Sequence, residues 1–292
     1  MDTNDFLLTE FEANRGHLRA VAYRMLGSLP EAEDAVQETW LKVAAADTDD
    51  IANIGGWFTT VTSRVCLNML RSRRTRREES LDIVHVPDPI VAPLDPTGDP
   101  EAQAVLADSV SVALLVVLET LTPSERLAFV LHDLFAMPFE EVAPIVDKTP
   151  SAARKLASRA RARVQGATPR SPEHSEQRRV VETFLAASRG GDLDALMAVL
   201  DPDIVLRNDH APDKAPMELV GVEKVARGAI LYRAANARSQ LVRVNGGFGV
   251  LSFAGDEVSA IASFTVVNGR VRAMNIVSDP ERIARMDFSG IV

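Results

Sequence analysis

Apolar residues recur every three or four positions through the first third of the chain, a spacing typical of amphipathic helices. The pattern predicts two helices over residues 5–45, separated by a break at 27–30, and a third helix over 57–77. We expect the following positions to face inward: Phe11, Leu18, Val21, Ala22, Met25, Leu26, Ala32, Ala35, Val36, Trp40, Leu41, Val43, Phe58, Val61, Val65, Leu67 and Leu70. Residues 1–80 are therefore predicted to form an all-α domain.

Five prolines then interrupt residues 81–100, and proline cannot continue a helix or a central strand. We interpret residues 81–105 as a linker. A strongly apolar stretch leads to Thr122-Pro123, which reads as a helix N-cap followed by proline at the first helical position. Three short helices are expected over 124–135, 138–146 and 150–165. Residues 106–168 are therefore predicted to form a second all-α domain.

The pattern changes after a polar break at 166–175. Alternating apolar positions predict strands, and Asn268-Gly269 is typical of a tight hairpin turn. Helices are expected over 176–190, 193–200 and 221–235, and strands over 203–207, 240–245, 248–253, 259–267 and 270–277. Residues 174–292 are predicted to be an α+β domain with a curved antiparallel sheet.

Charge is distributed unevenly along this chain, whose net charge is −9. Residues 64–77 carry six arginines and no acid, and residues 151–170 carry six basic side chains and no acid. The segments before each stripe are strongly acidic, with 11 acids in residues 1–63 and 14 in 78–150. Two cationic stripes on helices in an anionic chain favour binding to DNA at two places, although each stripe alone also fits a solvated helix face.

The strongest local motif covers residues 138–163, which reads as helix, short turn and helix. Small or apolar side chains of the second helix, Ala152, Ala153, Leu156, Ala157 and Ala160, face inward, and its basic side chains face outward. In a helix-turn-helix the second helix enters the major groove. We expect Ser151, Arg154 and Lys155 to contact bases and Arg159 and Arg161 to hold phosphates. The alternative is a basic, exposed helix in a bundle.

The earlier stripe places arginines on a helix that begins with an aromatic residue. Basic groups beside an aromatic ring can grip phosphates and stack an unpaired base. The candidate DNA-binding residues here are Trp57, Arg64, Arg71, Arg73 and Arg74. For Trp57 taken alone, we favour a core aromatic residue as the explanation.

Composition limits the other classes of function. The chain has one cysteine, Cys66, so neither a disulfide within the chain nor a cysteine-based zinc site can form. No run of about 18 apolar residues predicts a membrane span, and the acidic N-terminus does not read as a secretory signal. We expect a cytoplasmic protein without a metal or a cofactor.

The order of these segments resembles the extracytoplasmic-function (ECF) sigma factors. EDAVQETWL at 33–41 and WFTTVTSRVCLNMLRSRRTR at 57–76 are similar to the second conserved sigma region, and LTPSERLAFVLHDLFAMPFEEVA at 121–143 with the basic helix after it is similar to the fourth. The resemblance implies binding to the clamp and flap of core RNA polymerase, with Asp34, Gln37 and Glu38 on the clamp. It also implies recognition of promoter DNA, the −10 element near residues 57–74 and the −35 element near 151–163.

Residues 175–283 resemble a SnoaL-like domain of the NTF2-like fold, as found in SigJ-type sigma factors. The resemblance implies a cone-shaped domain that takes the place of a separate anti-sigma protein and modulates activity. VPDPIVAP at 86–93 is similar to that subgroup's proline-rich motif, and SDPERI at 278–283, with Asp279 and Pro280, to its terminal motif. A cavity of this fold could be lined by Asp209, His210 and Asp213 and could hold a small-molecule ligand.

The sequence leaves two other functions open. One is a DNA-binding repressor or activator that works without polymerase, although it would need only one basic stripe. The other is a DNA-binding regulator fused to a small-molecule-binding or cyclase- or isomerase-like domain, with Asp209, His210 and Asp213 as acid–base groups. We favour a regulatory, non-enzymatic C-terminal domain, because fold analogy does not establish chemistry. Cutting the chain after about residue 170 should then alter transcription and leave DNA recognition in place.

Overall fold

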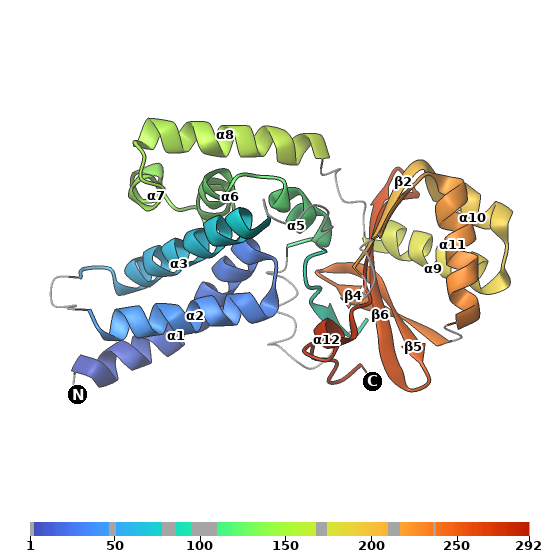
Figure 1. Cartoon of the computed structure of the whole chain (residues 1–292), viewed down its shortest axis with the longest axis horizontal. Helices are drawn as coiled ribbons and strands as arrows, with labels where there is room; N and C mark the ends of the chain where they lie inside the picture. The colour runs from blue at the N-terminus through green and yellow to red at the C-terminus, as the bar shows by residue number, and fades with distance from the viewer. Residues whose placement is uncertain are drawn as a thin grey trace. The chain divides into compact units, whose positions relative to one another are not determined.

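The computed structural model describes residues 3–46, 51–77, 86–94, 110–167, 174–209, 217–235 and 238–291. The chain packs into two units, each described by itself. We call residues 1–81 and 115–168 the helical unit, and residues 82–114 and 169–292 the sheet unit. Figure 1 shows the elements of both units in chain order. Among the described residues, no helix combines the length and the apolar character needed to cross a membrane.

Three helices form the first part of the helical unit: α1 (Thr3–Leu26), α2 (Leu29–Ala44) and α3 (Ile54–Arg77). Phe11 stands at their centre, with its ring 5.1 Å from that of Trp40 and 5.3 Å from that of Phe58. The predicted inward positions are buried or half-buried here, with one exception.

The exception is Leu41, whose side chain is 70% exposed. The buried stripe of α2 contains Ala32, Ala35, Val36 and Val43. At 100° per residue, Leu41 lies instead on the stripe of Asp34 and Glu38. The prediction that Leu41 faces inward is therefore wrong, because its helical phase, and not its apolar side chain, determines which side of α2 it occupies.

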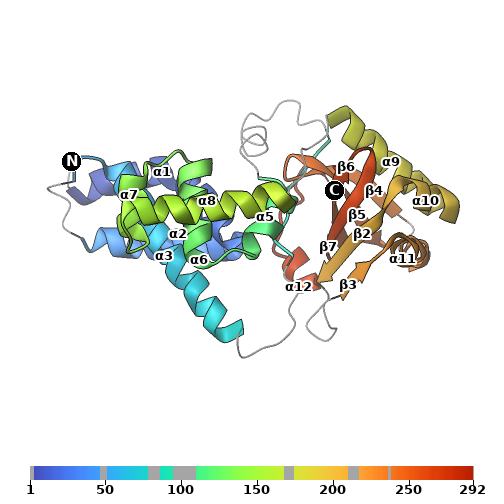
Figure 2. The same cartoon turned by 90° about the horizontal axis from the view of Figure 1, so that it is seen from above.

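The second part of the helical unit begins within α5 (Val112–Glu119), at Leu115. It continues with α6 (Pro123–Phe129), the π-helical turn η1 (Val130–Leu134), α7 (Phe139–Ile145) and α8 (Pro150–Ala167). Thr122 caps α6 as predicted. Its hydroxyl accepts a hydrogen bond from the Glu125 backbone N–H, and the Glu125 carboxylate accepts one from the Thr122 backbone N–H. This capping box fixes where α6 begins. Figure 1 shows α6 between α3 and α8, and Figure 2 shows α8 crossing over α6.

The loop between η1 and α7 contains a strained position. Ala136 is exposed and has φ = 55°, in the left-handed region that a side chain with a Cβ disfavours. We expect Ala136→Gly to stabilise the helical unit by about 1 kcal/mol. Denaturant unfolding followed by tryptophan fluorescence measures this, because both tryptophans, Trp40 and Trp57, lie in this unit.

A matched substitution tests the sign of that effect. Ala162 is exposed in the middle of α8, where glycine costs about 0.5–1 kcal/mol. Ala162→Gly should therefore lower the midpoint that Ala136→Gly raises. Equal shifts in the same direction would contradict the assignment of strain to Ala136.

The sheet unit is built on a seven-stranded sheet in the order β1-β4-β5-β6-β7-β2-β3. The strands are β1 (Val91–Ala92), β2 (Leu200–Asp209), β3 (Met217–Val220), β4 (Arg238–Val244), β5 (Gly247–Ala254), β6 (Glu257–Val267) and β7 (Arg270–Val277). All neighbours are antiparallel except β2 and β7. The predicted strands are confirmed, and β1 and β3 are additions.

Helices α9 (His174–Gly190), α10 (Leu193–Val199) and α11 (Val222–Ala235) cover one face of this sheet (Figure 1). The core between them includes Val181, Phe184, Leu196 and Phe264. The short helix α12 (Pro280–Ile283) follows β7. The predicted Asn-Gly turn is also present, since Asn268 and Gly269 have φ of 49° and 72°, the positive values that a type I′ turn requires.

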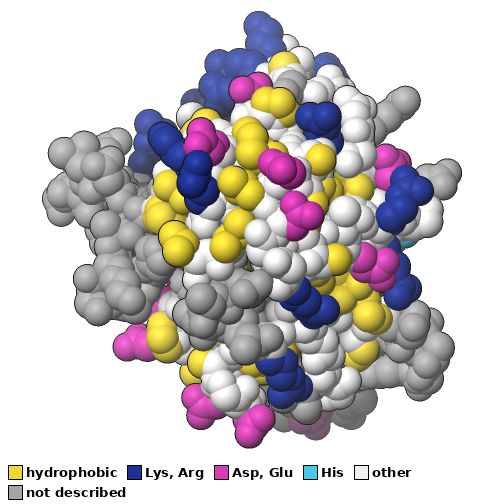
Figure 3. All heavy atoms as spheres, turned by 90° about the vertical axis from the view of Figure 1, so that its right-hand side faces the viewer, with side chains coloured by type: hydrophobic (Ala, Val, Ile, Leu, Met, Phe, Trp, Pro, Cys, Tyr) yellow, Lys and Arg dark blue, Asp and Glu magenta, His cyan; other side chains and the backbone are white. Residues whose placement is uncertain are grey.

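The outer face of the sheet unit exposes a few apolar side chains, Met197, Val220, Leu231 and Tyr232. Figure 3 shows apolar side chains on this side interspersed with charged and polar ones. Isolated exposed apolar residues of this kind are ordinary on protein surfaces.

Candidate nucleic-acid interface

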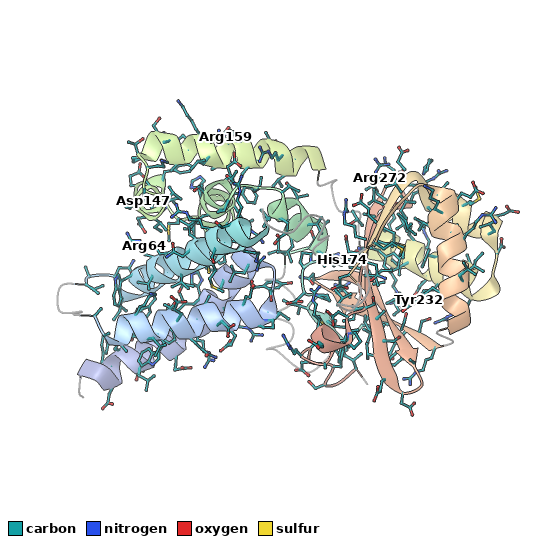
Figure 4. All side chains as sticks on the ribbon, viewed as in Figure 1. Arg64, Asp147, Arg159, His174, Tyr232 and Arg272 are labelled. Atoms are coloured by element: carbon teal, nitrogen blue, oxygen red, sulfur yellow. The ribbon has the colours of Figure 1, made fainter. Side chains whose placement is uncertain are left out.

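Helices α7 and α8 form the predicted helix-turn-helix. Asp147, at the turn, has φ = 55°, a conformation that Asp tolerates better than most residues. Ala153, Leu156, Ala157 and Ala160 are buried and Ala152 is half-buried, as the spacing predicts. The opposite face of α8 carries no acid and is exposed to solvent. Figure 4 labels Arg159 on α8 and Asp147 at the turn before it.

The first turns of α8 present cations that are free of carboxylates. Arg154 and Lys155 are exposed, as is Ser151. Among the described residues, no ion pair joins Lys148, Arg154 or Lys155 to an acid. The Arg154 guanidinium lies 5.1 Å from the centre of the Phe139 ring, which limits its freedom without neutralising it. These groups can therefore meet an anionic ligand with their full charge.

Lys148 was not among the predicted site residues. It lines a surface hollow of about 410 Å³ together with Ala152, Lys155, Leu156, Ser158 and Arg159. The signal in the sequence was a single lysine in the turn, directly before the N-cap residue Thr149. The structure adds Lys148 to the cationic face of α8.

The later arginines of α8 are tied to acids of the same unit. Arg159 Nε lies 3.3 Å from Glu125 Oε1, and Arg163 Nη1 lies 3.0 Å from Glu125 Oε2. Arg161 Nε lies 2.6 Å from Asp133 Oδ1. Because Arg159 and Arg163 remain at least half exposed, these pairs hold α8 on α6 and leave the guanidinium edges open to solvent.

Glu125 is the buried centre of this arrangement, with 3% of its surface exposed. Burial by itself would raise the pKa of Glu125. The hydrogen bonds from Thr122 and the charges of Arg163 and Arg159 outweigh burial, and the pKa lies below its usual value. The carboxylate therefore stays charged and keeps α8 in position.

Helix α3 presents a second cationic stripe. Trp57, Arg64 and Arg71 are spaced by seven residues, two helical turns, and so share one side of α3. Arg64 and Arg71 are exposed (Arg64 is labelled in Figure 4), and Trp57 is half-buried, with its ring 5.6 Å from that of Phe58. Trp57 thus packs against the core and keeps one side at the surface. Arg74 is also exposed.

Arg73 is placed differently from the other predicted DNA-binding residues. It faces into the helical unit, where it is ion-paired with Glu31, donates to the Leu26 carbonyl at 3.2 Å and lies 3.8 Å from Glu119 Oε1. With these contacts made, its guanidinium is turned away from the stripe of Arg64.

The exposed side of α2 carries the predicted protein-binding residues. Asp34, Gln37 and Glu38 are exposed and lie within one helical turn, and Leu41 continues the same stripe. Glu38 pairs with Lys42 at 3.2 Å on the surface. The face therefore combines carboxylates with one exposed leucine.

The predicted residues of the C-terminal domain that the structure describes, Asp209, Asp279 and Pro280, lie at or beside α12. Asp209 is ion-paired with Arg282, and its Oδ1 accepts a hydrogen bond from the Ser278 backbone N–H at 2.9 Å. Asp279 is the N-cap of α12, and Pro280 is its first residue. His210 and Asp213 lie outside the described residues.

Arg282 was not predicted, and it joins Asp209 to the proline-rich segment. Its Nε and Nη2 donate to Asp88 Oδ1 at 3.0 and 2.5 Å, and Nη2 donates to the Val86 carbonyl at 2.7 Å. Asp88 and Asp209 are 4% and 7% exposed. Burial is the main reason why the pKa of Asp209 is raised, although the charge of Arg282 and the bond from Ser278 act against it.

Comparison with known proteins covers both helical segments and the whole chain. Sigma-70 region 2 matches residues 11–76, and Sigma-70, region 4 matches residues 111–164. The ECF RNA polymerase sigma factor SigJ of Mycobacterium tuberculosis is 40% identical over 300 residues, 94% of this chain and 92% of that protein. The probable ECF RNA polymerase sigma factor SigI of the same species is 33% identical, covering 97% of each. The crystal structure of M. tuberculosis SigJ is similar with a TM-score of 0.75 at 37% identity, covering 96% of this chain and 99% of that one.

Proposed function

Because the chain belongs to the ECF sigma factors of RNA polymerase, we propose that α8 reads the −35 element, that the Trp57 stripe of α3 meets the −10 element, and that the α2 face binds core polymerase. The protein then works in the cytoplasm, where polymerase and promoter are. The predicted order of two helical sigma regions and an α+β domain is confirmed.

The assignment of α8 to the −35 element rests on one observation: the basic side chains on and beside α8 fall into two sets. The paired set, Arg159, Arg161 and Arg163, fixes the helix on Glu125 and Asp133. The second set, Lys148, Arg154 and Lys155, has no acidic partner among the described residues and projects near the helix start, where a recognition helix contacts bases. Arginine and lysine both suit the guanine edge, and both also suit a phosphate by their charge.

We expect Arg154→Ala and Lys155→Ala each to weaken promoter-specific transcription about 5–100-fold, the cost of one lost base contact. Binding to core polymerase should not change. Transcription in vitro with purified core enzyme and full-length protein measures the first effect, and a pull-down measures the second. Arg227→Ala is the matched control, since Arg227 is an exposed helical arginine on α11 paired only within its helix, with Glu223.

The two substitutions also separate base contact from phosphate contact. A base contact makes the loss depend on which −35 base pair is changed, whereas a phosphate contact weakens all promoters alike and lowers the salt dependence. Loss of polymerase binding together with transcription, or no loss of either, would contradict the assignment.

We assign the C-terminal domain a regulatory role that acts through the segment between the two sigma regions. Arg282 holds Val86 and Asp88 of the linker, while the turn residue Asn245 holds Ile90 of the linker and Val110 beyond it. The Asn245 backbone N–H donates to the Ile90 carbonyl at 2.9 Å, its Oδ1 accepts from the Ile90 N–H at 2.8 Å, and its Nδ2 donates to the Val110 carbonyl at 2.9 Å.

Strand β1 adds to this attachment, because Val91 and Ala92 pair with Val244 and Arg243 of β4. The described residues 86–94 and Val110, between the two sigma regions, are thus attached to the sheet unit. The separation of the sigma regions thereby becomes sensitive to the state of the C-terminal domain. Asp209 serves as a partner of Arg282 in this arrangement, which favours regulation over an acid–base role for its carboxylate.

A further inference from the structure

The exposed face of α8 includes one arginine that rests on an aromatic ring of α7. The Arg154 guanidinium lies over the Phe139 ring, 5.1 Å from its centre. Phe139 is the first residue of α7 and is 7% exposed, whereas Arg154 is exposed in the first turns of α8. A buried ring therefore supports an exposed cation across the turn of the helix-turn-helix.

The Phe139 ring is itself held by a second aromatic side chain. The His132 ring stacks on it, with the ring centres 3.8 Å apart and the planes inclined by 26°. His132 Nδ1 lies 2.9 Å from the Met137 carbonyl oxygen. Because a carbonyl oxygen can only accept, the imidazole donates its Nδ1 proton there, and this bond fixes the orientation of the imidazole. The ring beneath Arg154 is therefore held in one place.

The backbone that carries His132 has an uncommon conformation. His132 lies in the π-helical turn η1, in which the Phe135 N–H donates to the Val130 carbonyl at 3.2 Å. The Met137 N–H then donates to the Leu131 carbonyl at 2.9 Å, so the chain returns beside His132 before α7 begins. Single π-helical turns are rare and frequently occur at functional sites. Here the turn places His132 against the first residue of α7.

An arginine reads a base best when its guanidinium is already presented in the right orientation. The bidentate contact to guanine needs two N–H groups of the planar fork aimed at the base edge. An exposed arginine without a support samples many rotamers, and ordering them on binding costs free energy. The Phe139 ring limits this freedom before DNA arrives, and it leaves the charge of Arg154 in place because the ring carries no net charge.

The neighbouring cation has no such support. Lys155 is exposed next to Arg154 on α8, and in the part of the chain that the structure describes no aromatic ring lies under its ammonium group. Lysine also presents a point charge and not a planar fork. We therefore expect any contribution of the Phe139 ring to recognition to act through Arg154 and not through Lys155.

From this arrangement we propose that Phe139 and His132 are positioning residues for promoter recognition, and that they hold Arg154 in the orientation that reads a −35 base pair. The inference rests on the proposed function, since it assumes that α8 enters the major groove. Phe139 is buried and need not touch DNA, because it acts on base choice by limiting where the Arg154 guanidinium can lie. Changing either positioning residue should alter base preference at the position of Arg154 alone.

The test records base preference in addition to activity. Holoenzyme assembled from purified core polymerase and the full-length protein transcribes a barcoded promoter library randomised over both elements, and transcripts are counted by their barcodes. Arg154→Ala should flatten the preference at one −35 base pair. Phe139→Leu keeps an apolar side chain but removes the ring, and it should weaken the preference at that same base pair roughly 2–5-fold, the strength of one exposed cation–π contact. Phe139→Tyr keeps the ring and should retain the wild-type preference.

A double-substitution cycle shows whether Phe139 acts through Arg154. In the Arg154→Ala background, Phe139→Leu should change no base preference further. His132→Asn keeps a donor for the Met137 carbonyl but removes the stacked ring, and it should weaken the same preference by a smaller factor. If Phe139→Leu does not fold, His132→Asn decides the question, and an unchanged preference in that variant overturns the proposal.

Phe253→Leu is the matched control for Phe139→Leu. It makes the same change of side chain beneath another exposed arginine, Arg238, whose guanidinium lies 4.2 Å from the centre of the Phe253 ring in the sheet unit. The base preferences of this variant should equal those of the wild-type protein.

The outcomes distinguish failure of the positioning role from failure of the proposed function. If Phe139→Leu leaves the preference unchanged while Arg154→Ala flattens it, the positioning role is refuted and the promoter assignment stands. The positioning role is also refuted if Phe139→Leu weakens every position alike, if it keeps its effect beside Arg154→Ala, or if Arg154→Ala flattens no position. If wild-type holoenzyme shows no −35 preference in the library, the proposed function itself fails.

Discussion

Arg282→Ala is expected to destabilise the sheet unit by about 3–5 kcal/mol, the usual cost of removing one partner from a buried ion pair. The substitution leaves two carboxylates, Asp88 and Asp209, beneath the surface without the cation between them. It also removes the donor to the Val86 carbonyl. Thermal unfolding of the full chain, with hydrogen exchange of strands β4 to β7, measures the loss.

Arg285→Ala is the matched control for this substitution. Arg285 lies three residues further on, is mostly exposed and pairs only weakly with Glu281 at 4.0 Å. Surface pairs of this kind contribute about 0–1 kcal/mol. Equal losses from Arg282→Ala and Arg285→Ala would show that the burial of Asp88 and Asp209 is not what makes Arg282 important.

The pH dependence gives the same prediction a second readout. The folded pKa of Asp209 is already raised by burial, and removing the charge of Arg282 raises it further. A raised folded pKa means that the folded protein binds the proton more tightly than the unfolded chain. Stability then falls as pH rises through the interval between the two pKa values. The cost of Arg282→Ala should accordingly be larger at neutral pH than at acidic pH.

Asn245→Gly tests whether the contacts to the linker affect transcription independently of protein stability. Asn245 has φ = 47°, which glycine adopts readily, so the turn is retained while the side-chain bonds to Ile90 and Val110 are lost. We expect changed transcription with a smaller loss of stability than Arg282→Ala causes, because neutral groups rather than carboxylates lose their partners. Transcription identical to that of the wild-type protein in both Arg282→Ala and Asn245→Gly would remove the case for control through the linker.

The residues of α8 illustrate what local pattern can determine. Its buried side was predictable because small side chains recur with helical spacing, and its outer side because no acid occurs between 151 and 170. The assignment of Arg73 to the DNA-binding stripe rested on charge alone. Helical phase places Arg73 about 160° from Trp57, on the side that meets Glu31 and Glu119.

The linker attachment could not have been predicted from spacing. Asp88 and Arg282 are 194 positions apart in the chain, and no periodicity connects positions at that separation. The two-residue strand β1 is likewise too short to leave a pattern, and its pairing depends on the β4 edge that receives it. Lys148 was overlooked for a related reason, since a turn residue acquires its role only from the helix beside it.

Charge reversal on α2, Asp34→Lys with Glu38→Lys, is expected to reduce binding to core polymerase at least 100-fold, because like charges brought together across an interface cost several kcal/mol. Both side chains are exposed, and Glu38 contributes only a surface pair with Lys42. Folding should therefore be unaffected. Binding of the full-length variant to purified core enzyme is the measurement.

The control variant changes the net charge of the protein by the same amount, but on a different helix. Asp5→Lys with Glu12→Lys reverses two exposed acids on α1 of the same unit. If binding depends on the overall negative charge of the helical unit, both double variants lose affinity alike. If it depends on the α2 face, only Asp34→Lys with Glu38→Lys does.

Leu41→Ala then tests whether polymerase packs closely against the α2 face or is only attracted to its charges. An exposed leucine among carboxylates gains about 1.5–3 kcal/mol when a partner buries it, and that gain is insensitive to salt. Leu41→Ala should hence weaken polymerase binding roughly 10–100-fold at any ionic strength, whereas the loss from charge reversal should shrink as salt rises. A purely electrostatic encounter would leave Leu41→Ala without effect, and the α2 face would then attract polymerase without forming a close-packed contact with it.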